Sequence, residues 1–232
     1  MMRMLVSVRD VPEALIAAHG GADFIDLKEP RDGALGGLDV ATIAAIVHAL
    51  RAQGSRLAIS ATIGDLPMSE LDAILARVAA VAACGVDYVK VGIERGPQAA
   101  AVLAALAASG RAIVPVFIAD RGLAFEQVEH ACALKFPALM VDTADKLAGS
   151  LFEVLCAAEL RRFIGAVRAS GALVGLAGAL RRPQLGALCA LAPDFAGFRS
   201  AVCVGARSGR LDPERLHALA AALHAAPAPA LA

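Results

Sequence analysis

Two ionisable side chains at the end of one apolar stretch point to chemistry. In Phe24-Ile25-Asp26-Leu27-Lys28-Glu29-Pro30, Asp26 and Lys28 are separated by a single residue. In a β-strand this spacing places both side chains on the same face. A lysine beside a carboxylate in a water-poor site can lose its proton more readily than a surface lysine and attack a carbonyl carbon as a free amine. The stretch therefore predicts carbonyl chemistry at a strand end.

Lysine is rare among the basic residues of this chain. Of the 22 lysine and arginine residues, only Lys28, Lys90, Lys135 and Lys146 are lysine. Arginine can supply a positive charge, but it does not deprotonate near neutral pH or form an imine. Lys28 and Lys90 lie in apolar, strand-like runs, where an unpaired lysine is almost never fully buried. We therefore interpret these two lysines as functional, whereas Lys135, at the end of an expected helix, needs no special role.

The composition is that of one large globular domain. The 232 residues are 58% hydrophobic and 19% charged, and the formal net charge is zero. No apolar run reaches the ~18–20 residues of a membrane span. The N-terminus also lacks the pattern of a secretory signal, so we expect a cytoplasmic protein with no membrane partner. Basic residues cluster only at Arg161-Arg162 and Arg181-Arg182, which argues against a nucleic-acid partner.

Cysteine and histidine spacing predicts no metal site. The five cysteines form no Cys-x-x-Cys pair and are odd in number, as is typical of reduced thiols. The five histidines fall in expected helices, away from strand ends, and no two have the spacing of metal ligands. We expect neither a metal nor another cofactor.

Short apolar strands alternate with helices along the whole chain, and one long helix is expected over Phe152–Ser170. This alternation, with connections of a few residues, is typical of a single (β/α)8 TIM barrel. The competing fold, an open doubly wound sheet, usually carries a glycine-rich phosphate loop after its first strand, and Ser7-Val8-Arg9-Asp10 is not one. We expect the barrel to span residues 1–224 and residues 225–232 to form a flexible C-terminal tail. The expected strands are Met4–Val8, Asp23–Lys28, Arg56–Thr62, Val86–Gly92, Ala112–Ile118, Ala138–Thr143, Ala172–Gly178 and Phe195–Arg199.

The polar residues at the carboxyl ends of barrel strands should share one mouth. Two lysines and two or three acids there suit carbonyl chemistry, in which one amine forms a Schiff base and the second moves a proton. The alternative is a set of salt bridges, Lys28 with Asp26 or Lys90 with Asp142, although desolvating such pairs seldom adds stability. The expected mouth residues are Ser7, Asp26, Lys28, Ser60, Thr62, Lys90, Asp120, Asp142, Thr143 and Arg199.

Two strand ends predict phosphate binding. The stretches Ala177–Leu180 and Arg199–Val202 follow the seventh and eighth strands, where barrels often bind phosphate through backbone amides and a short helix N-terminus. Small residues there let the backbone approach an anion, although ordinary turns would look similar. The candidate substrate- and phosphate-binding residues are Ser7, Ser60, Thr62, Gly178, Arg199 and Ser200.

Six stretches, in this order, carry a family resemblance that covers nearly the whole chain. They are Phe24–Pro30 with Gly33 and Leu35-Gly36, Ser60–Asp65, Asp87–Gly92, Met140–Ala144 with Lys146, Leu176–Gly178, and Arg199–Cys203. Together they resemble the (5-formylfuran-3-yl)methyl phosphate synthases, a family of TIM barrels that make the furan precursor of the one-carbon carriers methanofuran and methylofuran. The resemblance implies a lyase that condenses two molecules of a phosphorylated aldehyde, glyceraldehyde 3-phosphate, with loss of phosphate and water.

The resemblance also implies roles for individual residues. Lys28 looks like the Schiff-base lysine and Lys90 like the proton acceptor, while Asp26, Asp142 and Lys146 match further active-site positions. Two alternatives remain, another class I aldolase acting on a phosphorylated sugar and a non-catalytic barrel that binds a phosphorylated ligand. The alanine-rich helix faces would allow close packing between subunits, so we expect a homo-oligomer.

Overall fold

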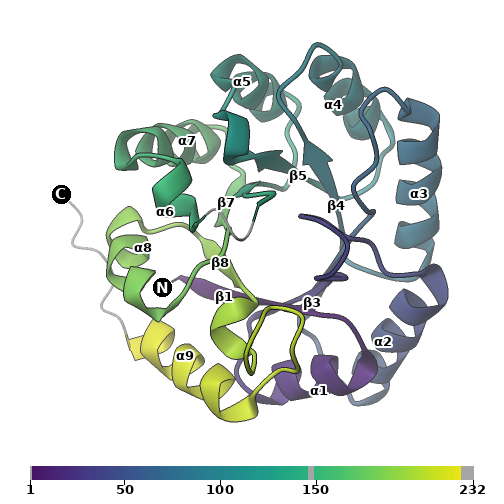
Figure 1. The fold of residues 1–232 in the computed structure, drawn as a ribbon. Coiled ribbons are helices and arrows are strands. Elements are labelled where there is room, and N and C mark those ends of the chain that lie inside the picture. Colours follow the sequence, from purple (N-terminus) through teal and green to yellow (C-terminus); the bar gives the residue numbers. More distant parts are fainter. Residues whose placement is uncertain (1, 146–148, 226–232) are drawn as a thin grey trace.

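Eight parallel strands close into a barrel in the computed structural model, which describes residues 2–145 and 149–225. Each strand pairs with the next along the chain, and β8 pairs back onto β1. The helices form a ring outside the strands (Figure 1). The expected (β/α)8 barrel is therefore confirmed. The strands are β1 (Arg3–Val8), β2 (Phe24–Leu27), β3 (Ala58–Thr62), β4 (Tyr88–Ile93), β5 (Ile113–Ile118), β6 (Ala138–Asp142), β7 (Leu173–Leu176) and β8 (Phe195–Phe198).

Local sequence signals fix where several helices begin. The carboxylate of Asp10 accepts a hydrogen bond from the Glu13 backbone N–H, and Asp39 caps the next helix through Thr42 in the same way. Such caps satisfy backbone donors that have no partner in the first turn. The α-helices are α1 (Val11–His19), α2 (Val40–Ala52), α3 (Leu71–Ala83), α4 (Ala99–Ala108), α5 (Phe125–Ala133), α6 (Leu151–Val154), α7 (Ala157–Ala169), α8 (Leu185–Leu191) and α9 (Pro213–Ala225). The short 3-10 helices are η1 (Ala119–Arg121), η2 (Arg182–Gln184) and η3 (Ser200–Val202).

The single long helix expected over Phe152–Ser170 is wrong, because this segment forms two helices. Leu155, between α6 and α7, has an extended backbone with φ −119° and ψ 136°. The N-terminus of α7 is closed by the Glu159 carboxylate, which accepts a hydrogen bond from the Cys156 N–H at 3.0 Å. A side chain three residues inside the helix thus starts a new helix within an apolar pattern that reads as continuous.

The strand pleat divides the core into two layers. In β1, Met4, Val6 and Val8 pack outward against the helices, whereas Leu5 faces the barrel interior. The interior layer is closed by residues such as Phe195, whose ring contacts Phe24 edge-on with centroids 5.6 Å apart. The alternation of side chains along each strand therefore separates the residues that stabilise the barrel from those that can line a site.

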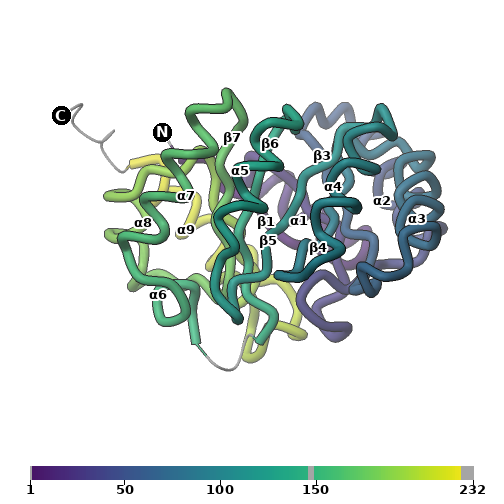
Figure 2. Tube along the Cα trace, turned by 90° about the horizontal axis from the view of Figure 1, so that it is seen from above, coloured from purple at the N-terminus to yellow at the C-terminus, as the bar shows by residue number. Residues whose placement is uncertain are grey.

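The segments that follow β2 and β8 lie at the same end of the barrel, the lower edge in Figure 2. This is the end toward which the strands run, where barrel enzymes bind their substrates. None of the described helices is long and apolar enough to cross a membrane. The expected tail falls almost entirely on residues 226–232, which lie outside the described residues. The domain limits, cytoplasmic location and homo-oligomer stay predictions.

Candidate active site

Ser7, Asp26 and Ser60 form one row across three neighbouring strands. Ser7 is the register partner of Asp26 in the β1–β2 pair, and Asp26 is the partner of Ser60 in the β2–β3 pair. Residues in register point to the same face of a parallel sheet, so both hydroxyls reach the carboxylate between them. Ser60 Oγ donates to Asp26 Oδ1 at 2.6 Å, and Ser7 Oγ donates to Asp26 Oδ2 at 3.2 Å. Asp26 is thereby held in one orientation inside the barrel.

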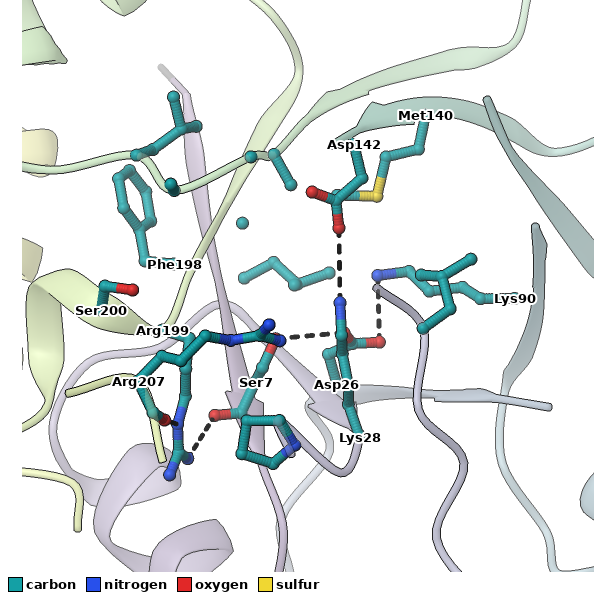
Figure 3. A pocket seen from close by; sticks show the side chains of 18 residues that line it. Ser7, Asp26, Lys28, Lys90, Met140, Asp142, Phe198, Arg199, Ser200 and Arg207 are labelled. Atoms are coloured by element: carbon teal, nitrogen blue, oxygen red, sulfur yellow. Dashed lines mark hydrogen bonds and ion pairs between the residues drawn. The ribbon is translucent and has the colours of Figure 1, made fainter. Parts of the chain in front are cut away.

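Two lysine–aspartate pairs cross the barrel interior (Figure 3). Lys90 Nζ lies 2.9 Å from Asp26 Oδ1, and Lys28 Nζ lies 3.3 Å from Asp142 Oδ2. The most exposed of these four residues, Lys28, is only 6% exposed. The pairs considered from the sequence, Lys28 with Asp26 and Lys90 with Asp142, are therefore wrong. Lys28 lies one residue beyond β2 and extends across to β6, which leaves the Asp26 carboxylate to Lys90 from β4.

These groups line a pocket of about 570 Å³ that includes its open mouth. The pocket reaches from the two ion pairs to the segments after β7 and β8. Of the residues expected at the mouth, Ser60, Thr62, Asp120 and Thr143 do not line it. The Thr62 hydroxyl instead donates to the carbonyl of Gly36 at 2.8 Å and so supports the segment after β2. The lining residues are Leu5, Ser7, Asp26, Lys28, Pro30, Leu35, Lys90, Met140, Asp142, Ala177, Gly178, Ala179, Leu180, Gly197, Phe198, Arg199, Ser200 and Arg207.

The segment between β2 and α2 covers part of the pocket with Leu35. The Asp65 carboxylate, beyond β3, accepts hydrogen bonds from the Leu35 N–H at 3.1 and 3.3 Å. Gly92 in β4 leaves the space that Leu35 uses, because a Cβ there would lie 2.9 Å from Leu35 Cδ1. Gly33 has φ +78°, and a Cβ on it would lie 2.0 Å from an Asp65 oxygen. The glycines of this segment thus permit its close packing over the barrel.

The segment after β7 presents backbone to the pocket. Gly178 has φ +121°, and Ala179 has φ +45°. A Cβ at Gly178 would lie 2.9 Å from Thr143 Cγ2, so only glycine fits without a shift. The N–H groups of Gly178 and Ala179 donate to no acceptor within the described residues. Ser200 begins η3 on the neighbouring side of the same pocket. This geometry can accept an anion through backbone donors.

Three further expected residues have other positions. Asp120 supports the segment after β6, because its carboxylate accepts from the N–H groups of Ala144 and Asp145. Thr143 is buried beside Gly178. Lys146, the fourth lysine, lies outside the described residues, so its predicted role remains a prediction.

Arg199 lies at the pocket wall, but its guanidinium points away from the pocket centre into a buried ion pair. Nη1 and Nη2 donate to the two carboxylate oxygens of Glu13 at 2.5 and 3.0 Å. The backbone of Arg199 borders the pocket, while its side chain ties β8 to the start of α1. The sequence gives no hint of this, since Glu13 reads as an ordinary residue in the first turn of a helix.

Arg207 is a lining residue that the sequence analysis did not single out. It lies between η3 and α9, and its side chain extends toward the pocket centre near Lys28 (Figure 3). Burial lowers the pKa of its guanidinium, Asp142 opposes this effect, and Arg199 adds to it. One signal could have identified it: Arg207 lies in the glycine-containing segment that follows the eighth strand, nine positions after Phe198, at the barrel mouth.

The fold and the pocket define a barrel of the TIM type, with two buried lysines and two buried carboxylates at the carboxyl ends of its strands. The model of the 4-HFC-P synthase family matches residues 4–220, so the chain belongs to this family. A relative from Archaeoglobus fulgidus, named (5-formylfuran-3-yl)methyl phosphate synthase, is 33% identical over 96% of this chain and all of that protein. One from Methylorubrum extorquens, provisionally given the same name, is 37% identical over 97% of this chain and 93% of its own length.

Solved structures agree with the fold. The phosphoribosyl anthranilate isomerase of Thermus thermophilus superposes with a TM-score of 0.64 over 96% of this chain and 98% of that one, at 20% sequence identity. At this identity the likeness supports the barrel architecture alone. The family membership confirms the resemblance drawn from the six sequence stretches.

Proposed function

We propose that this protein is a (5-formylfuran-3-yl)methyl phosphate synthase that condenses two glyceraldehyde 3-phosphate molecules through an imine on Lys28. The proposal makes it a lyase in the synthesis of the furan part of methanofuran or methylofuran. The observation that carries it is the pair of crossed lysine–aspartate contacts, Lys28 with Asp142 and Lys90 with Asp26, inside the pocket of a member of this family.

Lys28 is the nucleophile in this scheme. Its Nζ attacks the aldehyde carbon of the first substrate, and water leaves as the imine forms. Asp142, which accepts a hydrogen bond from Nζ at 3.3 Å, can hold the proton that the amine gives up. Forming an imine in a buried site requires such an acceptor because little bulk water reaches the nitrogen.

Lys90 moves the next proton. The imine withdraws electrons from the neighbouring carbon, so a base can remove its hydrogen and leave an enamine. Asp26 lies 2.9 Å from Lys90 Nζ and is itself fixed by Ser7 and Ser60. The enamine can then expel phosphate from the adjacent carbon or attack the aldehyde carbon of the second substrate. Loss of water and closure of the ring complete the furan, and hydrolysis of the imine releases the product aldehyde and regenerates the Lys28 amine.

Borohydride trapping tests the covalent step. The purified protein is incubated with glyceraldehyde 3-phosphate and sodium borohydride, and peptide mass spectrometry locates the added mass. We expect a reduced adduct on Lys28. An adduct on Lys90 would exchange the two roles, and folded protein with no adduct on either lysine would contradict the proposal and favour a barrel that only binds its ligand.

Product analysis tests the reaction itself. A conjugated furan aldehyde absorbs in the ultraviolet, whereas a simple aldol product does not. Trapping on Lys28 without the furan chromophore would assign the protein to another class I aldolase. We expect both the adduct and the chromophore from the same preparation.

A further inference from the structure

All five N–H donors of the Arg199 guanidinium are already used. An arginine side chain has five such donors in a planar fork. In this protein Nε donates to the carbonyl of Arg207 at 2.8 Å, Nη1 to the Ser7 carbonyl at 3.0 Å and to Glu13, and Nη2 to the Gly209 carbonyl at 2.7 Å and to Glu13. No donor remains for a phosphate, although a phosphate-binding role is what its position after β8 predicts.

Arg207 has the opposite arrangement. Within the described residues its guanidinium donates only to the Gly33 carbonyl, through two long contacts of 3.4 and 3.5 Å. It forms no ion pair with any described carboxylate, whereas Lys28, Lys90 and Arg199 each have one. Arg207 is thus a partly buried cation beside the pocket, and most of its guanidinium N–H donors have no partner within the described residues. A buried charge of this kind gains more from an anionic ligand than an exposed one, because water competes less.

The backbone around Arg207 is held by hydrogen bonds to three consecutive carbonyls, those of residues 207, 208 and 209. Arg199 binds the carbonyls of residues 207 and 209, and Arg9 Nη1 binds the Ser208 carbonyl at 2.7 Å. Glu13 joins the two arginines, since its carboxylate also accepts from the Arg9 N–H at 3.1 Å. Glu13 is buried, with 4% of its surface exposed. This network fixes the loop so that the Arg207 side chain faces the pocket.

We infer that Arg207 binds the phosphate monoester of the substrate, and that Arg199, with Glu13, is a positioning residue that acts through the loop backbone. Arg207 supplies paired N–H donors for phosphate oxygens, and the unpartnered N–H groups of Gly178 and Ala179 border the same pocket. Bidentate recognition of phosphate is a task to which the planar guanidinium is suited. The inference rests on the proposed function for the identity of the substrate, but not for the binding of a phosphate group.

Binding of inorganic phosphate and of glyceraldehyde 3-phosphate, measured by titration calorimetry, tests the role of Arg207. Arg207→Gln should weaken both by about 10- to 100-fold, the effect of losing hydrogen bonds to a charged group. Arg210→Gln is the matched control, because Arg210 is an exposed arginine of the same loop that does not line the pocket. Unchanged affinity in Arg207→Gln would overturn the inference.

Trapping at Lys28 gives a second readout. The concentration for half-maximal borohydride trapping should rise in Arg207→Gln for glyceraldehyde 3-phosphate and stay constant for unphosphorylated glyceraldehyde. A rise for both aldehydes would mean that Arg207 acts on the lysines instead of the phosphate, against the inference. Wild-type protein that binds phosphate through Arg207 but yields no furan would contradict the proposed function alone, so the two failures are distinguishable.

The positioning role of Arg199 is tested by a double variant. Arg199→Lys should weaken phosphate binding as Arg207→Gln does, and Arg199→Lys/Arg207→Gln should be no weaker than either single variant. If the loss of phosphate affinity in the double variant equals the product of the two single losses, Arg199 contacts the ligand itself, against the inference. A purely structural Arg199 would lower the melting temperature without changing the ratio of affinities for the phosphorylated and unphosphorylated aldehydes. If Arg199→Lys does not fold, Arg9→Gln, which releases the Ser208 carbonyl, replaces it in the same comparison.

Discussion

Lys28 and Asp142 are 114 positions apart in sequence and belong to opposite sides of the barrel, yet Nζ and Oδ2 lie 3.3 Å apart. Lys28 follows β2, and Asp142 ends β6. The contact spans the interior of the closed sheet above the row formed by Ser7, Asp26 and Ser60. It gives each lysine its own carboxylate, which allows the two amines to do different work.

Lysine at position 28 should be irreplaceable for catalysis. We expect Lys28→Arg to keep the fold, since arginine can retain the ion pair with Asp142, and to lower turnover by at least about 10³-fold, because a guanidinium does not form an imine. Turnover and borohydride trapping measure this. Lys135→Arg, at an exposed position two residues beyond α5, is the control and should behave as wild type. A folded Lys28→Arg protein with normal turnover would sink the assignment.

Replacing the carboxylate of Asp142 and that of Asp26 should slow different steps of the reaction. Asp142→Asn should slow trapping on Lys28, whereas Asp26→Asn should leave trapping in place and slow furan formation by about 10²- to 10⁴-fold, the usual contribution of a positioned proton-transfer group. Each variant also leaves a buried lysine without its partner, at about 3–5 kcal/mol in the free energy of unfolding. Thermal melts measure this loss of stability separately from the loss of activity. The reverse pattern, with trapping lost in Asp26→Asn and retained in Asp142→Asn, would exchange the roles of the lysines.

The position of Leu35, in the segment between β2 and α2, should be disturbed by a methyl group at position 33. Gly33→Ala places a Cβ 2.0 Å from the Asp65 oxygen and so disturbs the carboxylate that holds the Leu35 N–H. Gly54 has a similar positive φ, +74°, but a Cβ there would meet no atom within 4 Å, so Gly54→Ala carries the backbone penalty of about 1–2 kcal/mol without the clash. We expect turnover to fall on the order of 10²-fold only in Gly33→Ala. Equal turnover in Gly33→Ala and Gly54→Ala would mean that the segment between β2 and α2 does not contribute to catalysis.

Thiol labelling should follow burial. Cys156 is exposed, whereas Cys203 is buried, and burial raises the pKa of the Cys203 thiol while Arg199 opposes this. Since the thiolate is the reactive form, iodoacetamide should label Cys156 in the folded protein and Cys203 only after unfolding. Peptide mass spectrometry after timed labelling measures both. Cys156→Ser should remove the fast site, and rapid labelling of Cys203 in folded protein would contradict its buried position.

The raised pKa of the Cys203 thiol should lower the stability of the folded protein at alkaline pH. A group with a raised pKa in the folded state favours its protonated form there, so its contribution to stability is complete below the thiol pKa of the unfolded chain. That contribution is lost as pH rises through the higher folded value. Thermal melts should therefore decline less steeply above neutral pH in Cys203→Ala than in wild type. An identical slope in both proteins would mean that Cys203 does not ionise differently in the two states.

Much of the barrel could be predicted from sequence because its signals are local. The apolar strands, the glycines that end helices and the caps at Asp10 and Asp39 depend on neighbours within a few residues. The break at Leu155 could not be predicted in this way, because the apolar spacing on its two sides reads as one helix. A single glutamate reaching back to Cys156 decides that boundary.

By itself, the sequence determined the fold class, the strand ends that carry polar side chains, and the selection of Lys28, Lys90, Asp26 and Asp142 as candidates for the chemistry. These follow from residue type and from a spacing of two along a strand. Only the tertiary structure decided which lysine faces which carboxylate, that Arg199 is fully engaged by Glu13 and backbone carbonyls, and that Arg207 faces the pocket. The physical reason is that ion pairs and hydrogen bonds depend on distances across the closed barrel between residues far apart in sequence, such as Arg199 and Ser7, which are 192 positions apart. Local sequence patterns carry no information about such distances.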